Sequence, residues 1–287
     1  MRSTSKLKEI MKRRAAVIVP GAANAMFGRA IEDLGFEAVY ATGAGIANME
    51  LGTPDIGLTT MTEIAEIVAR LASGVSIPII VDADTGFGNP LNIVRTVRTF
   101  ERAGAAGIQI EDQIFPKKCG HFRGKEVIPM GEMLDKIRAA LDARQDSDLQ
   151  IIARTDVRAV EGLDRAIERA NTFLEAGADA TFVEAPISVD ELARIPREVR
   201  GPQIANMVFG GKTPDPGQAK LAEMGFSIVF YANAVLQAAL KASYDVLRAL
   251  KEDGSLLSVQ DRLASFEERQ RAVGKREWDA LEARYRT

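Results

Sequence analysis

The chain has 287 residues, of which 46% are hydrophobic and 27% charged, a balance that is typical of globular proteins and excludes a disordered chain. Its 37 basic and 40 acidic residues give a net charge of −3, which argues against nucleic acid or an anionic membrane as partner. One Cys and one His exclude an internal disulfide and a Cys/His zinc site. Because the basic start lacks the apolar region of a secretory signal and no apolar run reaches the ~20 residues of a membrane span, we expect a cytoplasmic protein.

Eight short apolar runs alternate with helical patterns along the chain. The predicted strands are 16–20, 38–42, 78–84, 107–111, 150–154, 180–184, 203–207 and 226–231. Helical patterns lie near 60–72, 92–102, 130–144, 163–175, 190–192, 216–223 and 235–251. Glycines 35, 104, 177 and 225 stand just before strands, where a helix that ends in a left-handed C-cap requires them.

Eight βα units in under ~260 residues predict an α/β fold, a single (β/α)8 TIM barrel. The alternative is an open doubly wound sheet, disfavoured because no strand is followed by G-x-G-x-x-G. We expect one domain, 1–287, with the barrel at about 15–252 and a charged helical tail at about 256–287. Apolar residues of this tail cover its own barrel or pack on another subunit: Leu263, Phe266, Trp278, Leu281 and Tyr285.

Polar residues stand at the carboxyl ends of the predicted strands, where TIM barrels carry their sites. Asp82 and Asp84 end the third strand and Glu111 ends the fourth, and such an oxygen-only cluster favours Mg²⁺ or Mn²⁺. The alternative is that these carboxylates only make turns and helix caps. Arg154, at the end of the fifth strand, suits a substrate carboxylate, unless it only forms an ion pair with a neighbouring acidic residue, Glu184 or Asp156.

The loop after the fourth strand, 115–127, is basic and contains glycine. It holds Cys119 and His121, each the only residue of its type, in the segment KKCGH. Neighbouring cations lower the pKa of a thiol, and a loop of this kind can cover a barrel mouth. A surface loop with an incidental cysteine is the alternative. The small-residue turn that begins at Thr42 can offer backbone N–H groups to an anion, or can simply be a tight turn.

Several segments resemble the isocitrate lyase/phosphoenolpyruvate mutase superfamily over about residues 5–270. They are VDADTGFGN (81–89), IQIEDQ (108–113), KKCGH (117–121), ARTD (153–156), FVEAP (182–186) and NMVFGGKTP (206–214). The Cys-Gly-His loop resembles the lyase branch, which includes 2-methylisocitrate lyase, 2,3-dimethylmalate lyase and petal death protein. The resemblance implies a Mg²⁺-dependent enzyme that cleaves a carbon–carbon bond of a substituted 2-hydroxy di- or tricarboxylate. The products would be a 2-oxoacid, pyruvate or glyoxylate, and a carboxylate.

The resemblance also implies roles for residues of this chain. Asp84 would bind Mg²⁺ (or Mn²⁺), with Asp82 and Glu111 acting through water. The residues that would contact the substrate are Thr42, Gly43, Ala44, Asp55, Gly120, Arg154, Asn206 and Phe209. The catalytic set would be Cys119, His121, Tyr40, Glu184 and Arg154. In this set Cys119 protonates the departing enediolate, and Tyr40 lies beside the nascent 2-oxoacid.

Departures from the family pattern bear on the substrate. Phe209 stands where lyases of smaller substrates often carry an acidic residue, and Gln237 and Phe266 stand near the places of late arginines in tricarboxylate-cleaving members. We therefore expect a smaller or more apolar 2-hydroxy or 2-oxo dicarboxylate. An oxaloacetate decarboxylase or hydrolase is the alternative, followed by a phosphonomutase and a non-catalytic binding barrel. The family's habit of exchanging a C-terminal helix between subunits implies a homotetramer.

Overall fold

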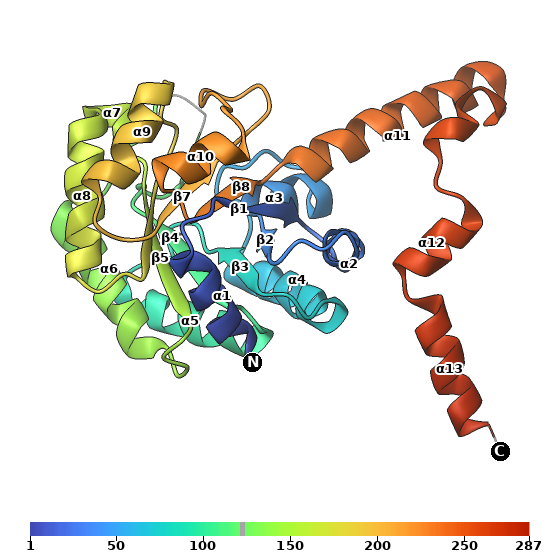
Figure 1. Ribbon diagram of the computed structural model, residues 1–287, viewed down its shortest axis with the longest axis horizontal. Helices are drawn as coiled ribbons and strands as arrows, with labels where there is room; N and C mark the ends of the chain where they lie inside the picture. Colours follow the sequence, from blue (N-terminus) through green and yellow to red (C-terminus); the bar gives the residue numbers. More distant parts are fainter. Residues whose placement is uncertain (121–123, 287) are drawn as a thin grey trace.

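The computed structural model describes residues 1–120 and 124–286 and shows a closed barrel of eight parallel strands (Figure 1). The strands are β1 (Val17–Ala22), β2 (Val39–Ala41), β3 (Ile79–Asp82), β4 (Gly107–Glu111), β5 (Gln150–Thr155), β6 (Ala180–Val183), β7 (Gln203–Asn206) and β8 (Ile228–Tyr231). Each strand pairs with the next along the chain, and β1 closes the ring by pairing Val17 with Ile228 of β8. The prediction of a TIM barrel is confirmed, and the open sheet is excluded.

Helices surround this barrel. They are α1 (Ser3–Lys12), α2 (Ala25–Asp33), α3 (Gly43–Glu50), α4 (Met61–Gly74), α5 (Pro90–Ala103), α6 (Met130–Ala143), α7 (Arg158–Glu161), α8 (Leu163–Glu175), α9 (Val189–Glu198), α10 (Gln218–Met224) and α11 (Ala234–Asp253). A 3₁₀ helix (Leu257–Arg262), α12 (Phe266–Ala272) and α13 (Lys275–Tyr285) follow. Glycines 35, 104, 177 and 225 all have positive φ, as their C-cap positions predict. Among the described residues, no helix is both long enough and apolar enough to cross a membrane.

Helix α1 covers the amino-terminal end of the barrel, a feature that the sequence analysis missed. Its Leu7, Ile10 and Met11 are buried in one cluster with the side chains that fill the barrel. Leu7 lies against Gly107, the first residue of β4, so this helix seals the end opposite the carboxyl ends of the strands. The apolar spacing at positions 7, 10 and 11 is the signal that could have found it.

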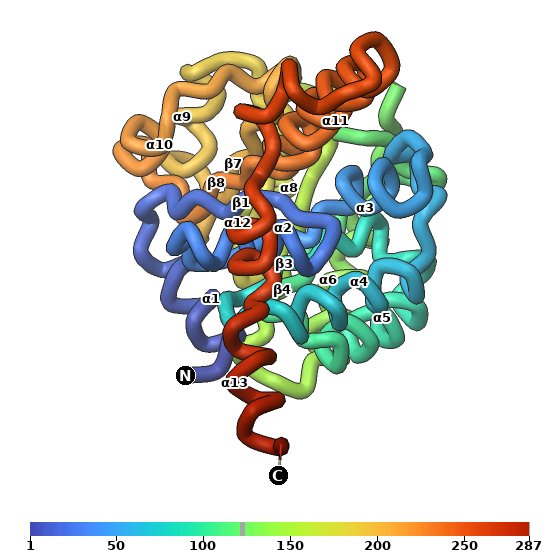
Figure 2. Tube along the Cα trace, turned by 90° about the vertical axis from the view of Figure 1, so that its right-hand side faces the viewer, coloured from blue at the N-terminus to red at the C-terminus, as the bar shows by residue number. Residues whose placement is uncertain are grey.

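The C-terminal segment leaves the barrel. Helix α11 projects outward, and the chain then returns with α12 and α13 along the side of α2 (Figures 1 and 2). The Arg29 Nε donates to the Ala272 carbonyl at 3.1 Å, yet a hollow of about 300 Å³ lies between α2 and the returning segment. The apolar residues of the tail are exposed, from 39% for Leu263 to 73% for Tyr285. The alternative that these residues cover their own barrel is therefore wrong.

Candidate active site

A small cavity of about 30 Å³ lies at the carboxyl ends of the strands. It is lined by Tyr40, Thr42, Ala44, Asp55, Asp82, Cys119, Gly120, Arg154, Glu184, Asn206, Val208, Ala232 and Asn233. The structure thus brings together most of the site residues proposed from the sequence. Phe209 is an exception, because its side chain is 87% exposed and does not line the cavity. His121 lies outside the described residues.

The carboxylates of Asp82 and Asp84 lie side by side next to the first residue of α3. A Cβ atom on Gly43 would be 2.9 Å from an Asp82 oxygen and 3.3 Å from Asp84 Oδ1, so this approach requires glycine. The Gly43 N–H donates to Asp82 Oδ2 at 3.3 Å, and the Asp84 N–H donates to Asp82 Oδ1 at 3.1 Å. These bonds hold Asp82 in place, which leaves Asp84 as the carboxylate directed at a cation.

Lys117 supplies the positive charge that these carboxylates contact. Its Nζ is 2.8 Å from Asp84 Oδ1 and also donates to Asp55. Burial raises the pKa of Asp84 to about 6, although Lys117 opposes the rise, and burial raises the pKa of Glu111 well above its usual range. Burial alone would lower the pKa of Lys117, but Asp84 and Glu111 outweigh it and raise this pKa well above the ordinary value. The ammonium therefore stays charged.

The residues present fit a divalent cation with few direct protein ligands. Around the cavity six described carboxylates face three cations: Asp55, Asp82, Asp84, Glu111, Asp156 and Glu184 against Lys117, Lys125 and Arg154. Glu111 Oε1 is buried and accepts no hydrogen bond from any described residue. Within the described ranges, no three His, Cys, Asp or Glu side chains form a direct ligand set. A hard cation held by Asp84 and otherwise by water suits this arrangement.

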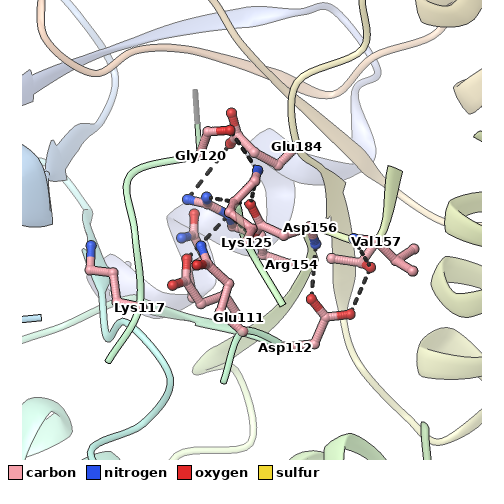
Figure 3. Close-up of polar contacts among 12 residues, drawn as sticks. Glu111, Asp112, Lys117, Gly120, Lys125, Arg154, Asp156, Val157 and Glu184 are labelled. Carbon is pink, nitrogen blue, oxygen red and sulfur yellow. Dashed lines mark hydrogen bonds and ion pairs between the residues drawn. The ribbon is translucent and has the colours of Figure 1, made fainter. Parts of the chain in front are cut away.

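Arg154, at the end of β5, lies at the centre of the buried charges (Figure 3). It donates to Asp156 from Nε at 2.9 Å and from Nη2 at 3.1 Å, and its Nε is 3.3 Å from Glu111 Oε2. Its Nη1 is 3.6 Å from Glu184 Oε2. The ion pair considered from the sequence therefore exists, yet the arginine also lines the cavity and can reach a substrate carboxylate. Burial would lower its pKa, but Asp156 and Glu111 outweigh this effect, so the guanidinium keeps its charge.

Asp112 holds the end of β5 in place through hydrogen bonds. It accepts hydrogen bonds from the Asp156 N–H at 2.9 Å, from Thr155 Oγ1 at 2.7 Å and from Arg169 Nη1 at 2.9 Å. It is fully buried and does not line the cavity. Its role is structural, since it fixes the turn that carries Asp156, the ion-pair partner of Arg154.

Tyr40, on β2, is held rigidly. Its ring stacks on Phe230 with centroids 4.1 Å apart, and its hydroxyl donates to Gln109 Oε1 at 3.2 Å. Burial raises the pKa of Tyr40 well above its ordinary value, and the negative charge of Asp82 raises it further. The hydroxyl therefore stays protonated at the cavity wall, with its proton donated to Gln109.

The turn that begins at Thr42 is the first turn of α3. Thr42 is its N-cap and accepts from the Gly45 N–H at 3.3 Å. The sequence predicted a small-residue turn here, and the structure shows that this turn begins a helix. Thr42 and Ala44 line the cavity, so the positive end of the helix dipole faces it. This end supports the predicted binding of a carboxylate.

The loop segment that carries Cys119 lies deep in the site. The Cys119 N–H donates to the Asp55 carbonyl at 3.1 Å. A Cβ on Gly120 would be 2.5 Å from Glu184 Cδ and 2.6 Å from Arg154 Nη2, so only glycine fits against these side chains. A cavity of about 30 Å³ is far below the roughly 300 Å³ of a small-molecule pocket, so a lining segment must move to admit a substrate.

Comparison with known proteins shows the family. The family model described as "Phosphoenolpyruvate phosphomutase" matches residues 7–251. The chain belongs to the phosphoenolpyruvate mutase/isocitrate lyase superfamily. Over 287 residues it is 43% identical to the "2,3-dimethylmalate lyase" of Eubacterium barkeri, covering 100% of this chain and 99% of the relative.

Two further relatives of this superfamily differ in chemistry. The "2-methylisocitrate lyase" of Aeropyrum pernix is 44% identical, covering 96% of this chain and 89% of the relative. The "Carboxyvinyl-carboxyphosphonate phosphorylmutase, chloroplastic" of Arabidopsis thaliana is also 44% identical, covering 99% of this chain and 85% of the relative. Overall identity therefore does not separate the relative named as a lyase from the relative named as a phosphorylmutase.

Solved structures of the superfamily share the fold over nearly the whole chain. A structure of 2,3-dimethylmalate lyase has a TM-score of 0.92 at 31% identity, covering 99% of this chain and 95% of that one. Oxaloacetate acetylhydrolase with 3,3-difluorooxalacetate has a TM-score of 0.92 at 31% identity, with coverages of 98% and 95%. Phosphonopyruvate hydrolase with oxalate and Mg²⁺ has a TM-score of 0.90 at 30% identity and covers 99% of each chain.

Several contacts in this superfamily member were missed from the sequence. Lys117 and Lys125 were noted only as charges of a basic loop, and Val208 and Ala232 were not proposed to line the cavity. Ala232 follows β8 and Val208 follows β7, so the rule that sites form at strand ends could have found both. No pattern in the sequence indicates the partners of the two lysines.

The Asp156 carboxylate predicts an acid-dependent loss of stability. Burial would raise the pKa of Asp156, but Arg154 and Lys125 outweigh burial and hold the pKa at about 2. Because the pKa in the folded protein lies below the ordinary 3.8, the ionised Asp156 adds about 2 kcal/mol to the free energy of unfolding above pH about 4. This stabilisation is lost as the pH falls through about 2. In urea unfolding at pH 5, 4 and 3, the free energy of unfolding should fall more steeply with decreasing pH for the wild type than for Asp156→Asn. Equal pH dependence in the two proteins would contradict the assignment.

Proposed function

We propose that the protein is a Mg²⁺-dependent carbon–carbon lyase that cleaves a substituted malate-type 2-hydroxy acid. The products are a 2-oxoacid, pyruvate or glyoxylate, and a carboxylate. The observation that carries the proposal is the position of Cys119, which lines the same cavity as Arg154 and Asp82. Relatives named 2,3-dimethylmalate lyase and 2-methylisocitrate lyase support it.

The chemistry requires a negative charge to be stabilised first on one fragment and then on the other. Deprotonation of the 2-hydroxyl places the charge on its oxygen, and cleavage of the carbon–carbon bond turns that oxygen into the carbonyl of the 2-oxoacid and moves the charge to the leaving enediolate. Mg²⁺ (or Mn²⁺), when bound at Asp84, supplies a Lewis acid for the oxygens of the 2-oxoacid, with Asp82 and Glu111 acting through water. Arg154 and the amino end of α3 bind the substrate carboxylate, and the protonated Tyr40 lies beside it.

Cys119 supplies the proton that completes the reaction. Its thiol protonates the leaving enediolate carbon, with Glu184 and His121 in support. The carboxylates that line the cavity, Asp55, Asp82 and Glu184, are the groups available to accept the 2-hydroxyl proton. Tyr40 is unsuited to that role, because its raised pKa keeps the hydroxyl protonated.

The cavity favours a substrate with two carboxylates and a small apolar substituent. Arg154 is the one arginine among its lining residues in the described part of the chain, and the apolar lining residues include Ala44, Val208 and Ala232. The buried Asn206 Oδ1 accepts no hydrogen bond from a described residue, so it is available for a substrate hydroxyl.

A 2-oxoacid release assay tests the proposal. Substituted malates, substituted citrates, oxaloacetate and phosphonopyruvate are each incubated with enzyme and Mg²⁺, and both substrate loss and the formation of pyruvate, glyoxylate or oxalate are measured. We expect turnover of a substituted malate above that of any citrate. Turnover of oxaloacetate alone would favour the decarboxylase or hydrolase, which the structural likeness to oxaloacetate acetylhydrolase keeps as the second candidate. Turnover of phosphonopyruvate alone would favour phosphorus chemistry.

We also propose that the protein is a cytoplasmic homotetramer. The exposed tail residues Phe266, Trp278 and Tyr285, each at least 64% exposed, have an apolar surface that a second copy of the chain would cover. Light scattering at micromolar concentration should give about four times the 31.1 kDa of one chain. A chain truncated after Gly254 should give a smaller assembly, whereas a monomeric full-length protein would refute the proposal.

A further inference from the structure

Lys125 is a buried lysine that the proposed chemistry does not use. Its side chain is 1% exposed, and Nζ donates to the Gly120 carbonyl at 2.5 Å and to Asp156 Oδ1 at 2.6 Å (Figure 3). A buried ammonium is costly unless it is paired and hydrogen-bonded, so this placement requires both partners. The lysine therefore joins the backbone beside Cys119 to a carboxylate of the barrel.

That carboxylate is also the main partner of Arg154. Asp156 receives two hydrogen bonds from Arg154 and one from Lys125, so a single side chain sets the positions of both cations. Gly120 in turn lies directly against Arg154 and Glu184. The chain Gly120–Lys125–Asp156–Arg154 thus connects the residue next to the proton donor with the residue that binds the substrate carboxylate.

The other lysine contacts of the same loop do not make this connection. Lys118 is exposed, and its Nζ donates to the Gly124 carbonyl at 2.6 Å, within the loop itself. Lys117 contacts Asp55 and Asp84 on the metal side of the cavity. Among the described loop residues, Lys125 is the one whose side chain bonds both the loop backbone and the partner of Arg154.

We propose that Lys125 is a positioning residue that fixes Cys119 relative to Arg154 by bonding Gly120 and Asp156 together. The effect on turnover rests on the proposed function. The effect on Cys119 exposure does not, because it can be measured without any substrate. The expected changes in turnover and in Cys119 exposure can therefore be refuted independently of each other.

The test compares Lys125→Met with Lys125→Arg and with the matched control Lys118→Met. Cys119 is the only thiol, so its alkylation by iodoacetamide in the Mg²⁺-supplemented protein reports on one position. Measuring the rate across pH separates exposure of the thiol from its thiolate fraction. We expect Lys125→Met to raise the thiolate alkylation rate roughly tenfold and to lower kcat ~10²-fold with a smaller change in KM, the scale of a catalytic group displaced by about 1 Å.

Lys125→Arg should reverse most of both changes, because it keeps the charge and the two acceptors. Lys118→Met removes the cation next to Cys119, so it controls for altered thiol ionisation, and its thiolate alkylation rate, taken from its own pH profile, should match that of the wild type. If Lys125→Met does not fold, Lys125→Gln is measured by the same criteria. An alkylation rate and kcat within twofold of the control, or a loss that Arg does not recover, would overturn the inference. Faster alkylation in a protein without lyase activity would uphold the positioning role and reject the proposed function.

Discussion

Replacing Cys119 with Ser should lower the turnover of a substituted malate by ~10²–10⁴-fold, the range for loss of a general acid. Ser keeps the size of the side chain but is a much weaker acid. Binding of pyruvate or oxalate should change little, because Asp84, Arg154 and the amino end of α3 form that part of the site. Steady-state kinetics and calorimetric titration of oxalate with Mg²⁺ measure the two quantities separately.

The same variant separates the two enzyme hypotheses. A decarboxylase needs no proton donor at this position, so oxaloacetate turnover by Cys119→Ser would remain near the wild-type rate. Alkylation of Cys119 should inactivate the lyase, and oxalate with Mg²⁺ should slow the alkylation if the segment covers bound ligand. A Cys119→Ser enzyme that cleaves the malate at the wild-type rate would rule out the proposed role.

Removing divalent cations should abolish activity altogether. EDTA-treated enzyme should be inactive and should recover with Mg²⁺ or Mn²⁺, because the cation offsets the excess of buried carboxylates around Asp84. A readout without substrate is the melting temperature. Mg²⁺ at a hundred times its Kd should stabilise the wild type by about 2.7 kcal/mol.

Two substitutions sharpen this prediction. Asp84→Asn should lose most of the Mg²⁺-dependent rise in melting temperature, whereas Asp33→Asn, which removes an exposed carboxylate on α2, should keep it. Full activity after chelation, with no metal detected by elemental analysis, would contradict the metal assignment. An equal Mg²⁺ response in the two variants would show that the cation binds elsewhere.

Much of the fold followed from local patterns in the sequence. The strands were found because each is a short apolar run between helical patterns, and β4 has the predicted bounds. The third strand was predicted to continue through Asp84 but ends at Asp82, because Asp84 adopts φ +47°, which a strand does not accommodate. The path of α11 away from the barrel could not be predicted, since an apolar stripe does not specify which surface covers it.

The parts of the candidate site that lie at strand ends could be predicted from the barrel topology. Asp82, Glu111 and Arg154 end neighbouring strands of a closed barrel, so their convergence followed from the fold class alone. The contacts of Lys117 and Lys125 depend on how a long loop folds back, and residues up to 62 positions apart meet there. Phe209 was misplaced because a loop residue next to a strand end can face either way.

The central claim, cleavage of a substituted malate into a 2-oxoacid and a carboxylate, is tested most directly by the balance of products. A substituted malate that the enzyme consumes is followed by ¹³C NMR with Mg²⁺ until it is exhausted, and CO₂ is measured in parallel. The account predicts one 2-oxoacid and one carboxylate for each molecule consumed, with no CO₂ released. Stoichiometric CO₂, or oxalate with a carboxylate from oxaloacetate as the only substrate, would contradict it.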